Sequence, residues 1–271
     1  MLIGFNLEGD KFSLDYAKKR LKLLNRVCDF LEVPVYRFID EISLKIRSEP
    51  LRKFLDLTSS YNFKFTAHAR DNLWFERDKL KEIELTIEVA RLIGAKKVVF
   101  HPRFLDEVPP NLESDVRICV ENPRTLNSLT VFKLVKSLGY GFVLDIPHHF
   151  LFFADHKLDI KEAYAVLKDF DPDHLHLSNT FLREEKTLEA VVYVLKGQPK
   201  KAFKKLIGDF HLPLWYGDID YRKVLRNLKL PDTLLLEINS TNYELLGLKV
   251  ERSYRKEVIY LKYLLAKLKK L

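Results

Sequence analysis

The chain has 271 residues, of which 47% are hydrophobic and 31% charged, which excludes a disordered protein and predicts a single domain spanning 1–271. The formal net charge of +8 favours a polyanionic partner, although a Lys- and Glu-rich surface is also typical of thermophile proteins. No apolar run reaches the about 18 residues of a membrane span and no secretory signal is apparent, so we expect a cytoplasmic protein without membrane contact.

Eight short runs of β-branched and other apolar residues predict strands, with helical periods between most of them. Helical spacing is clear in 76–93, which ends before Gly94, and in 250–268 at the end of the chain. This alternation predicts an α/β fold, the (β/α)8 TIM barrel. A doubly wound sheet is the alternative, but no GxGxxG follows the first strand. The predicted strands are 2–7, 33–38, 63–68, 97–101, 116–121, 141–145, 174–178 and 233–238.

Two connections depart from the regular barrel pattern. Residues 102–115 carry three prolines and no helical period, so we expect the fourth helix to be missing or reduced. Segment 183–208 carries seven Lys/Arg and three Glu and predicts an extra basic helical insertion between strands seven and eight. The last stretch, 248–271, holds eight Lys/Arg and two Glu, so the positive charge is concentrated in these two segments.

The predicted strands end in imidazole and carboxylate side chains. In a βα barrel these ends meet at one face, where reactive groups lie. Four carboxylates converging there would repel one another without cations. Histidine and carboxylate, with no thiolate, are ligands for borderline divalent metals, and nine ligands suit two or three ions. Cys28 and Cys119 fit no metal or disulfide spacing. The candidate ligands are His68, His101, Glu121, Asp145, His148, His176, Asp209, His211 and Glu237.

Several motifs in chain order resemble the endonuclease IV group of the xylose isomerase-like barrels over about residues 60 to 240. They are FTAHAR, GAKKVVFHPR, CVENPR, VLDIPHH, LHLSN, DFHLPLWYGDID and LLLEIN. The resemblance implies a nucleic-acid phosphodiesterase with three zinc ions. It implies that His68, His101 and Glu121 hold the first ion. Glu121 would bridge to a second ion held by Asp145, His176 and Glu237, and His148, Asp209 and His211 would hold the third.

Tyr36-Arg37-Phe38 and Asp145-Ile146-Pro147-His148-His149 also look like ultraviolet-damage endonuclease. Arg37, Arg70 and Trp74 are candidate nucleic-acid contacts, as are Lys200 and Lys201 in the basic insertion. Each of them has an ordinary structural explanation as well. The loops that follow the strands do not match those of endonuclease IV, and Asn179 stands where that family usually places Asp. The substrate is therefore open among abasic DNA, another lesion and RNA.

Three functions remain in competition. The first is a metal-dependent endonuclease of DNA repair, in which an ion-activated water attacks the phosphodiester and Glu121, Asp145 and Glu237 are catalytic. The second is a single-metal sugar isomerase or epimerase of the same superfamily, which uses only the quartet Glu121, Asp145, His176 and Glu237. The third is a non-catalytic nucleic-acid-binding barrel. The five additional ligands favour the first, namely His68, His101, His148, Asp209 and His211. Its cofactor is Zn²⁺, with Mn²⁺ as an alternative, its partner is DNA or RNA, and no protein partner is implied.

Overall fold

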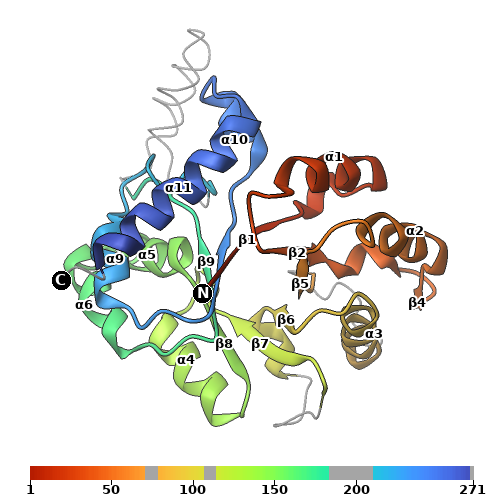
Figure 1. Cartoon of the computed structure of the whole chain (residues 1–271). Coiled ribbons are helices and arrows are strands. Elements are labelled where there is room, and N and C mark those ends of the chain that lie inside the picture. The colour runs from red at the N-terminus through yellow and green to blue at the C-terminus, as the bar shows by residue number, and fades with distance from the viewer. Residues whose placement is uncertain (71–78, 107–113, 183–209, 269–271) are drawn as a thin grey trace, which may run out of the picture.

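The computed structural model describes residues 1–70, 79–106, 114–182 and 210–268. Its eight long strands are parallel and close into a barrel in the order β1-β10-β9-β8-β7-β6-β5-β2 (Figure 1). A short antiparallel pair, β3 and β4, lies outside the barrel. The barrel strands are β1 (Leu2–Asn6), β2 (Phe30–Pro34), β5 (Lys64–His68), β6 (Lys97–Phe100), β7 (Arg117–Glu121), β8 (Gly141–Asp145), β9 (His174–Leu177) and β10 (Thr233–Leu236), and the outer pair is β3 (Ile39–Asp40) and β4 (Lys45–Ile46).

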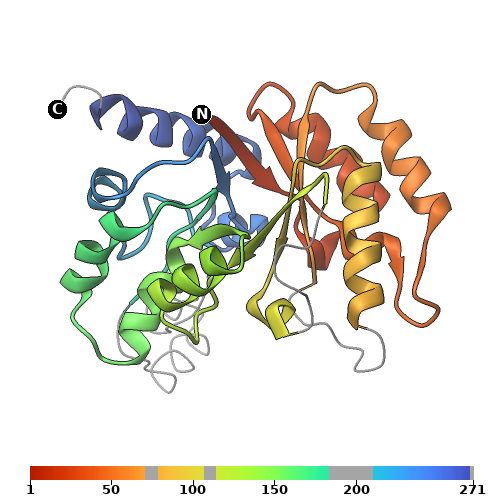
Figure 2. The ribbon, with the colours of Figure 1, turned by 90° about the horizontal axis from the view of Figure 1, so that it is seen from below.

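Helices cover the outside of the strands, as Figures 1 and 2 show from two directions. Many begin at a polar residue whose side chain accepts hydrogen bonds from the first turn, among them Ser13, Asn127 and Asp159. The α-helices are α1 (Leu14–Leu24), α2 (Ser48–Thr58), α3 (Lys79–Leu92), α4 (Ser128–Ser137), α5 (Ile146–Asp155), α6 (Ile160–Ala165), α9 (Tyr221–Asn227), α10 (Ser240–Leu245) and α11 (Val250–Leu268), and the 3-10 helices are η1 (Gly9–Lys11), η2 (Val35–Phe38), η3 (Pro102–Asp106) and η4 (Val166–Asp169).

The main hydrophobic core lies between the strands and the helices. Side chains alternate along a strand, so every second residue faces outward and packs against a helix. On β9, Leu175 and Leu177 belong to this outer core, and α11 buries Tyr254 and Leu261 against it. The inward positions of three neighbouring strands form a separate small cluster, Val99, Cys119 and Val143. Many of the remaining inward positions are polar, and they form the candidate site described below.

The predicted (β/α)8 barrel is confirmed, and most predicted strands agree with the structure to within one or two residues. The second strand is the exception, because it occupies Phe30–Pro34, whereas Val35–Phe38 forms η2. The charged Glu32 interrupts the apolar run and hides the strand from a pattern search. In the described part of 102–115, only the 3-10 helix η3 is present. The predicted basic insertion, 183–208, lies outside the described residues.

Gly4 permits a close approach between β1 and β2. A Cβ at this position would lie 2.5 Å from ring carbons of Phe30, whose side chain is buried. The Phe30 ring in turn packs beside His174, with ring centroids 5.7 Å apart. Glycine at position 4 therefore makes room for an aromatic ring that packs beside one of the interior histidines.

Among the described residues, no helix combines the length and the apolar character that crossing a membrane requires.

Candidate metal centre

The candidate ligands sit at or just beyond the carboxyl ends of the barrel strands, mostly at inward positions. Glu121 and Asp145 are the last residues of β7 and β8, and His68 is the last residue of β5. His101 follows β6 and Glu237 follows β10 directly. Outward neighbours such as Val120 and Leu144 are buried in the outer core, which fixes the register that turns the polar residues inward.

Glu121 lies at the centre of the cluster. Its carboxylate is 3.4 Å from His68 Nε2, 3.2 Å from His148 Nδ1 and 3.2 Å from His176 Nδ1. Only 2% of the residue is exposed. Burial by itself would raise the pKa of the Glu121 carboxyl, but the positive charge of His176 and the other imidazoles that face the carboxylate hold the pKa well below its usual value. Glu121 is therefore an anion in a nearly dry site.

His176 faces three carboxylates from a fully buried position. Its Nδ1 is 3.1 Å from Glu237 and 3.2 Å from Glu121, and its Nε2 is 3.6 Å from Glu32. Burial alone would lower the pKa of the imidazole, but these carboxylates raise it well above its usual value. The surroundings thus call for positive charge at this point. Yet neither ring nitrogen makes a hydrogen bond, as expected where both the ring and the carboxylates are arranged around a cation.

Four groups of three residues each bring their ligand atoms within 4.8 Å of one another, which is close enough for a shared ion. Glu121 belongs to two of the groups, and Asp145 and His176 also belong to two each. The groups therefore overlap and form one continuous cluster. They are His68, His101 and Glu121; Glu121, Asp145 and His148; Asp145, His176 and Glu237; and Glu32, His174 and His176.

Asn122 and the start of α5 hold Asp145 and His148 in place. The Asn122 side chain accepts a hydrogen bond from Asp145 N at 2.7 Å and donates one to Asp145 O at 3.1 Å. The Asp145 carboxylate caps α5 by accepting from His148 N at 2.6 Å. One turn of helix thereby sets the spacing between the two ligands of the Asp-x-x-His motif.

Backbone carbonyls fix the tautomers of two histidines. His68 Nδ1 lies 2.6 Å from Ala69 O, and His148 Nδ1 lies 3.0 Å from Asn122 O. A carbonyl only accepts, so each Nδ1 carries a proton and each Nε2 is left as the nitrogen with a lone pair. Metal-binding histidines are commonly held in this way.

This donor set fits divalent metal ions. Neutral imidazole and carboxylate are the ligands that Zn²⁺ and Mn²⁺ accept, and the sharing of Glu121 by two groups suits neighbouring ions. The buried His176 Nδ1, without a hydrogen bond between two carboxylates, is the clearest sign that a cation belongs there.

A polar cavity of about 210 Å³ adjoins the cluster at the mouth of the barrel. Glu32, His68 and Glu237 form its inner wall, and Tyr36 and Lys11 lie toward the outside. Lys11 is 37% exposed and donates to Ser240 Oγ at 2.9 Å. The cavity is smaller than typical drug-sized ligand sites, so it accommodates a small molecule or one unit of a longer substrate.

The structure gathers seven of the nine predicted ligands into the overlapping groups. His148 lies with Glu121 and Asp145. The third ion that the resemblance implies, held by His148, Asp209 and His211, stays a prediction. His211 lies in the wall of the cavity with its Nδ1 3.4 Å from Ser178 Oγ, outside the groups formed by the described residues. Asp209 lies outside the described residues.

Two of the predicted nucleic-acid contacts flank Tyr36 at the edge of the cavity. The guanidinium carbons of Arg37 and Arg70 lie 5.3 and 5.4 Å from the centre of the Tyr36 ring. Arg70 also pairs with Glu41 at 2.6 Å, so a phosphate would compete with this carboxylate. Trp74, Lys200 and Lys201 lie outside the described residues.

Glu32 and His174 were missed by the sequence analysis. Both are buried inward residues, Glu32 on β2 and His174 on β9, and both lie deeper in the barrel than the strand ends. The available signal was a charged residue inside an apolar strand, FLEVP, and two histidines at two-residue spacing in HLHL.

No protein-family model matches this sequence, and no curated protein matches it either. Two solved structures are similar. A D-allulose 3-epimerase from Methylomonas sp. has 11% identity and a TM-score of 0.58, with 97% of this chain and 98% of that chain covered. The TTHB071 protein of Thermus thermophilus, from a structure soaked with ZnCl2, has 16% identity and a TM-score of 0.55, with 91% and 97% covered. Identities this low show the fold alone, an eight-stranded β/α barrel.

Proposed function

We propose that this protein is a metal-dependent phosphodiesterase acting on nucleic acid, a DNA-repair endonuclease of the endonuclease IV type. The observation that carries the proposal is the overlap of ligand groups around Glu121, which suits two or more neighbouring ions. The ZnCl2 soak of the similar TTHB071 structure supports zinc as the ion. DNA is the proposed partner, with RNA as the alternative, and the net charge of +8 supports a polyanion.

The proposed roles follow from the groups. His68 and His101 hold one ion with Glu121, and His176 and Glu237 hold another with Asp145. Bound ions supply the positive charge that phosphoryl transfer needs and make water a better nucleophile at neutral pH. The protein orients the attacking water through the carboxylates of Glu121, Asp145 and Glu237. Lys11 lines the cavity, and Arg37 and Arg70 lie beside Tyr36 in its wall. These cations would contact the phosphate backbone.

A single-metal sugar isomerase or epimerase is the second candidate. The similarity to a D-allulose 3-epimerase favours it, and so does the small polar cavity beside Glu32 and Glu237. The quartet Glu121, Asp145, His176 and Glu237 would suffice for one ion. That reaction leaves His68, His101 and His148 without a role, although each of them lies in a ligand group.

Metal counting combined with two assays tests the choice. The purified full chain is saturated with Zn²⁺ or Mn²⁺, and bound metal is counted by mass spectrometry. It is then incubated with labelled duplexes that carry an abasic site, a pyrimidine dimer or no damage, and separately with keto-sugars. We expect at least two ions per chain and cleavage of a damaged duplex. One ion per chain with epimerisation of a keto-sugar establishes the second candidate, and nucleic-acid binding with no turnover in either assay contradicts both.

A further inference from the structure

A chain of polar side chains runs through the barrel interior beneath the candidate metal centre. Barrel interiors are ordinarily filled by branched apolar residues, as at Val99 and Val143 here. Below His176 the interior is polar instead, and most of these residues are buried. In order from the amino-terminal end of the barrel, the chain consists of Lys97, Thr233, His174, Glu32 and His176.

Lys97 is the donor at the amino-terminal end of this chain of contacts. Its ammonium has no lone pair and only donates, at 2.9 Å to Thr233 Oγ1 and at 2.5 Å to Asp173 O. Thr233 Oγ1 lies 2.7 Å from His174 Nδ1, so its hydroxyl proton is in position to be donated to that nitrogen. Because a carboxylate, Glu32, faces the other nitrogen, we place the ring proton of His174 on Nε2 and make Nδ1 the acceptor.

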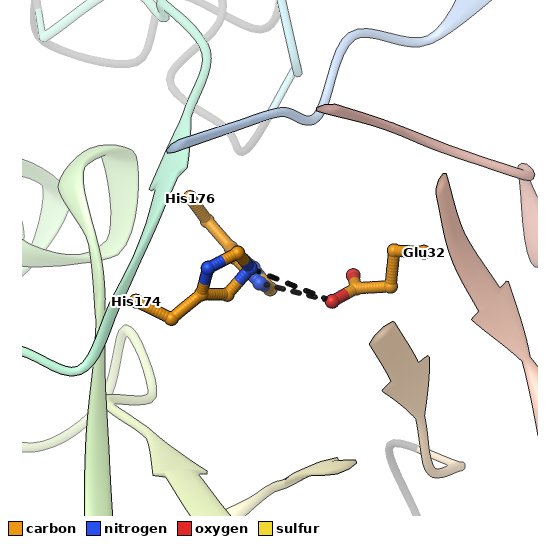
Figure 3. Close-up of side chains that lie close together, drawn as sticks. All are labelled: Glu32, His174 and His176. Carbon is orange, nitrogen blue, oxygen red and sulfur yellow. Dashed lines mark ion pairs between the residues drawn. The ribbon is translucent and has the colours of Figure 1, made fainter. Parts of the chain in front are cut away.

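Glu32 receives the other end of this chain. Its Oε2 lies 3.7 Å from His174 Nε2, 3.6 Å from His176 Nε2 and 3.3 Å from Thr66 Oγ1. Figure 3 shows both imidazoles projecting from β9 toward this one carboxylate. An ionised Glu32 has only acceptors to offer, and at these ion-pair distances its negative charge favours a proton on each of the two Nε2 atoms that face it.

We propose that Glu32 is a positioning residue that keeps the proton of His176 on Nε2 and so makes Nδ1 the metal ligand. The inference rests on the proposed metal centre. Nδ1 is the nitrogen that faces Glu121 and Glu237 at 3.2 and 3.1 Å. Glu32 thereby does for His176 what the Ala69 carbonyl does for His68, with the opposite ring nitrogen facing the cluster.

An ion bound directly by Glu32, His174 and His176 is the competing interpretation, since their ligand atoms also lie within 4.8 Å. It requires His176 to give Nε2 to the interior ion while Nδ1 serves the cluster above, which demands a fully deprotonated ring. Thr233 also connects His174 to the Lys97 ammonium, whose positive charge opposes a dication nearby. The positioning role of Glu32 needs neither condition.

Two measurements on the full chain test the proposal, namely zinc binding and ring ¹⁵N NMR of ¹⁵N-histidine-labelled protein. In metal-free wild type, measured at a pH high enough to leave the His176 ring neutral, we expect the single ring proton of His176 on Nε2. In Glu32→Gln we expect a rise in the form protonated on Nδ1, a loss of zinc affinity of about 10–100-fold, and an unchanged number of ions at saturation. Glu32→Asp keeps the charge and retains more of the affinity than Glu32→Gln.

Thr233→Val gives a second route that leaves Glu32 intact. It removes one hydroxyl at constant shape, so we expect the same direction of change in the His174 and His176 signals and a smaller loss of affinity. Val143→Ala, in the apolar part of the same interior, is the control and leaves the histidine tautomers and the zinc affinity as in wild type.

The outcomes separate the two proposals. Loss of one ion per chain in Glu32→Gln shows that Glu32 is itself a ligand, and unchanged ring signals and affinity show that it has no positioning role. Either result overturns this inference while leaving the metal centre standing. A wild type that binds no zinc overturns the proposed function, and with it the ligand role of Nδ1. The ring signals of the metal-free protein then still report whether Glu32 sets the tautomer.

Discussion

At the scale of single residues, Glu121 carries the largest share of the proposed site. It lies within 3.4 Å of three imidazoles and belongs to two ligand groups. Its neutral counterpart Glu121→Gln keeps the shape and loses the charge that both groups share. We expect the number of bound zinc ions to fall and cleavage to drop by more than about 100-fold, beyond the loss typical of residues that only support ligands.

The matched control for this change is Glu88→Gln, an exposed glutamate on α3. It should bind zinc and turn over as wild type does. Full activity in Glu121→Gln would contradict the central place of Glu121 in the site.

Residue types at strand ends were readable from the sequence, whereas deeper residues were not. Seven predicted ligands fall in the groups because imidazoles and carboxylates that directly end or follow apolar strands must meet at one rim. Glu32 and His174 escaped because a side chain inside the barrel has its partners on distant strands. The sequence of β2, FLEVP, does not indicate that Glu32 will face His174 on β9.

At the scale of elements, β1 and β2 depend on the absence of a side chain at Gly4. In Gly4→Ala the new methyl group would lie 2.5 Å from the buried Phe30 ring. We expect the free energy of unfolding to fall by about 1–3 kcal/mol, as overpacking of a close-packed core does. Urea denaturation measures this loss.

Adding Phe30→Leu to Gly4→Ala supplies the control, because the smaller side chain gives the methyl group room. The double variant should lose less stability than the sum of the two single losses. Strict additivity would show that the Phe30 contact is not the cause.

Helix α11 buries a carboxyl group among aromatic residues. Glu257 is fully buried and accepts a hydrogen bond from Leu214 N at 3.1 Å, and burial raises its pKa to about 8. Between about pH 4.5 and 8 the carboxyl group is therefore protonated in the folded state and ionised in the unfolded state. The contribution of Glu257 to stability is full below pH 4.5 and is lost as the pH rises through 8.

The variant Glu257→Gln removes this titration and keeps an oxygen for Leu214 N. We expect its melting temperature to fall less between pH 5 and 8 than that of wild type. One unit of pKa shift corresponds to about 1.4 kcal/mol, so the difference in the free energy of unfolding should reach several kcal/mol. Glu251→Gln, exposed on the same helix, should keep the wild-type slope. Parallel slopes for Glu257→Gln and wild type would contradict the buried, protonated carboxyl.

The elements were largely predictable because the outward strand positions and helix stripes are apolar. The predicted stripe on 250–268 includes Tyr254, Val258, Leu261 and Leu265, all buried in α11. Glu257 lies between them and is buried too, although its side chain is ionisable. Its burial depends on Leu214, a residue far away in the sequence, which periodicity does not report.

At the scale of the whole molecule, converging carboxylates couple metal binding to folding. Glu121 and Asp145 are almost completely buried, so without ions His176 offsets only part of the repulsion between the carboxylates. Zinc at about 100 times its Kd contributes about 2.7 kcal/mol, which corresponds to roughly 5–10 °C in a chain of this length. We expect EDTA to lower the melting temperature by this order and added Zn²⁺ to restore it.

The control is the same pair of melting temperatures, with EDTA and with Zn²⁺, measured on Glu121→Gln. The melting temperature of this variant should respond less to zinc. A wild-type melting temperature that is equal with EDTA and with Zn²⁺ would contradict metal binding at this site.

The architecture of the whole molecule followed from the count and order of apolar runs, since eight strands alternating with helices have few ways to pack. The activity does not follow in the same way. The same barrel serves unrelated reactions, and selectivity depends on loops whose conformation is set by contacts across the mouth of the barrel.

The His-Leu-His-Leu sequence of β9 has a consequence for how this chain tolerates change in length. Loss or gain of one residue within the strand would exchange the two faces, sending both leucines inward and both imidazoles into the apolar layer under the helices. A substitution in β9 changes one side chain, whereas an insertion or deletion of one residue reverses the orientation of every side chain that follows it in the strand. We therefore expect changes in chain length to be tolerated only in the connecting loops.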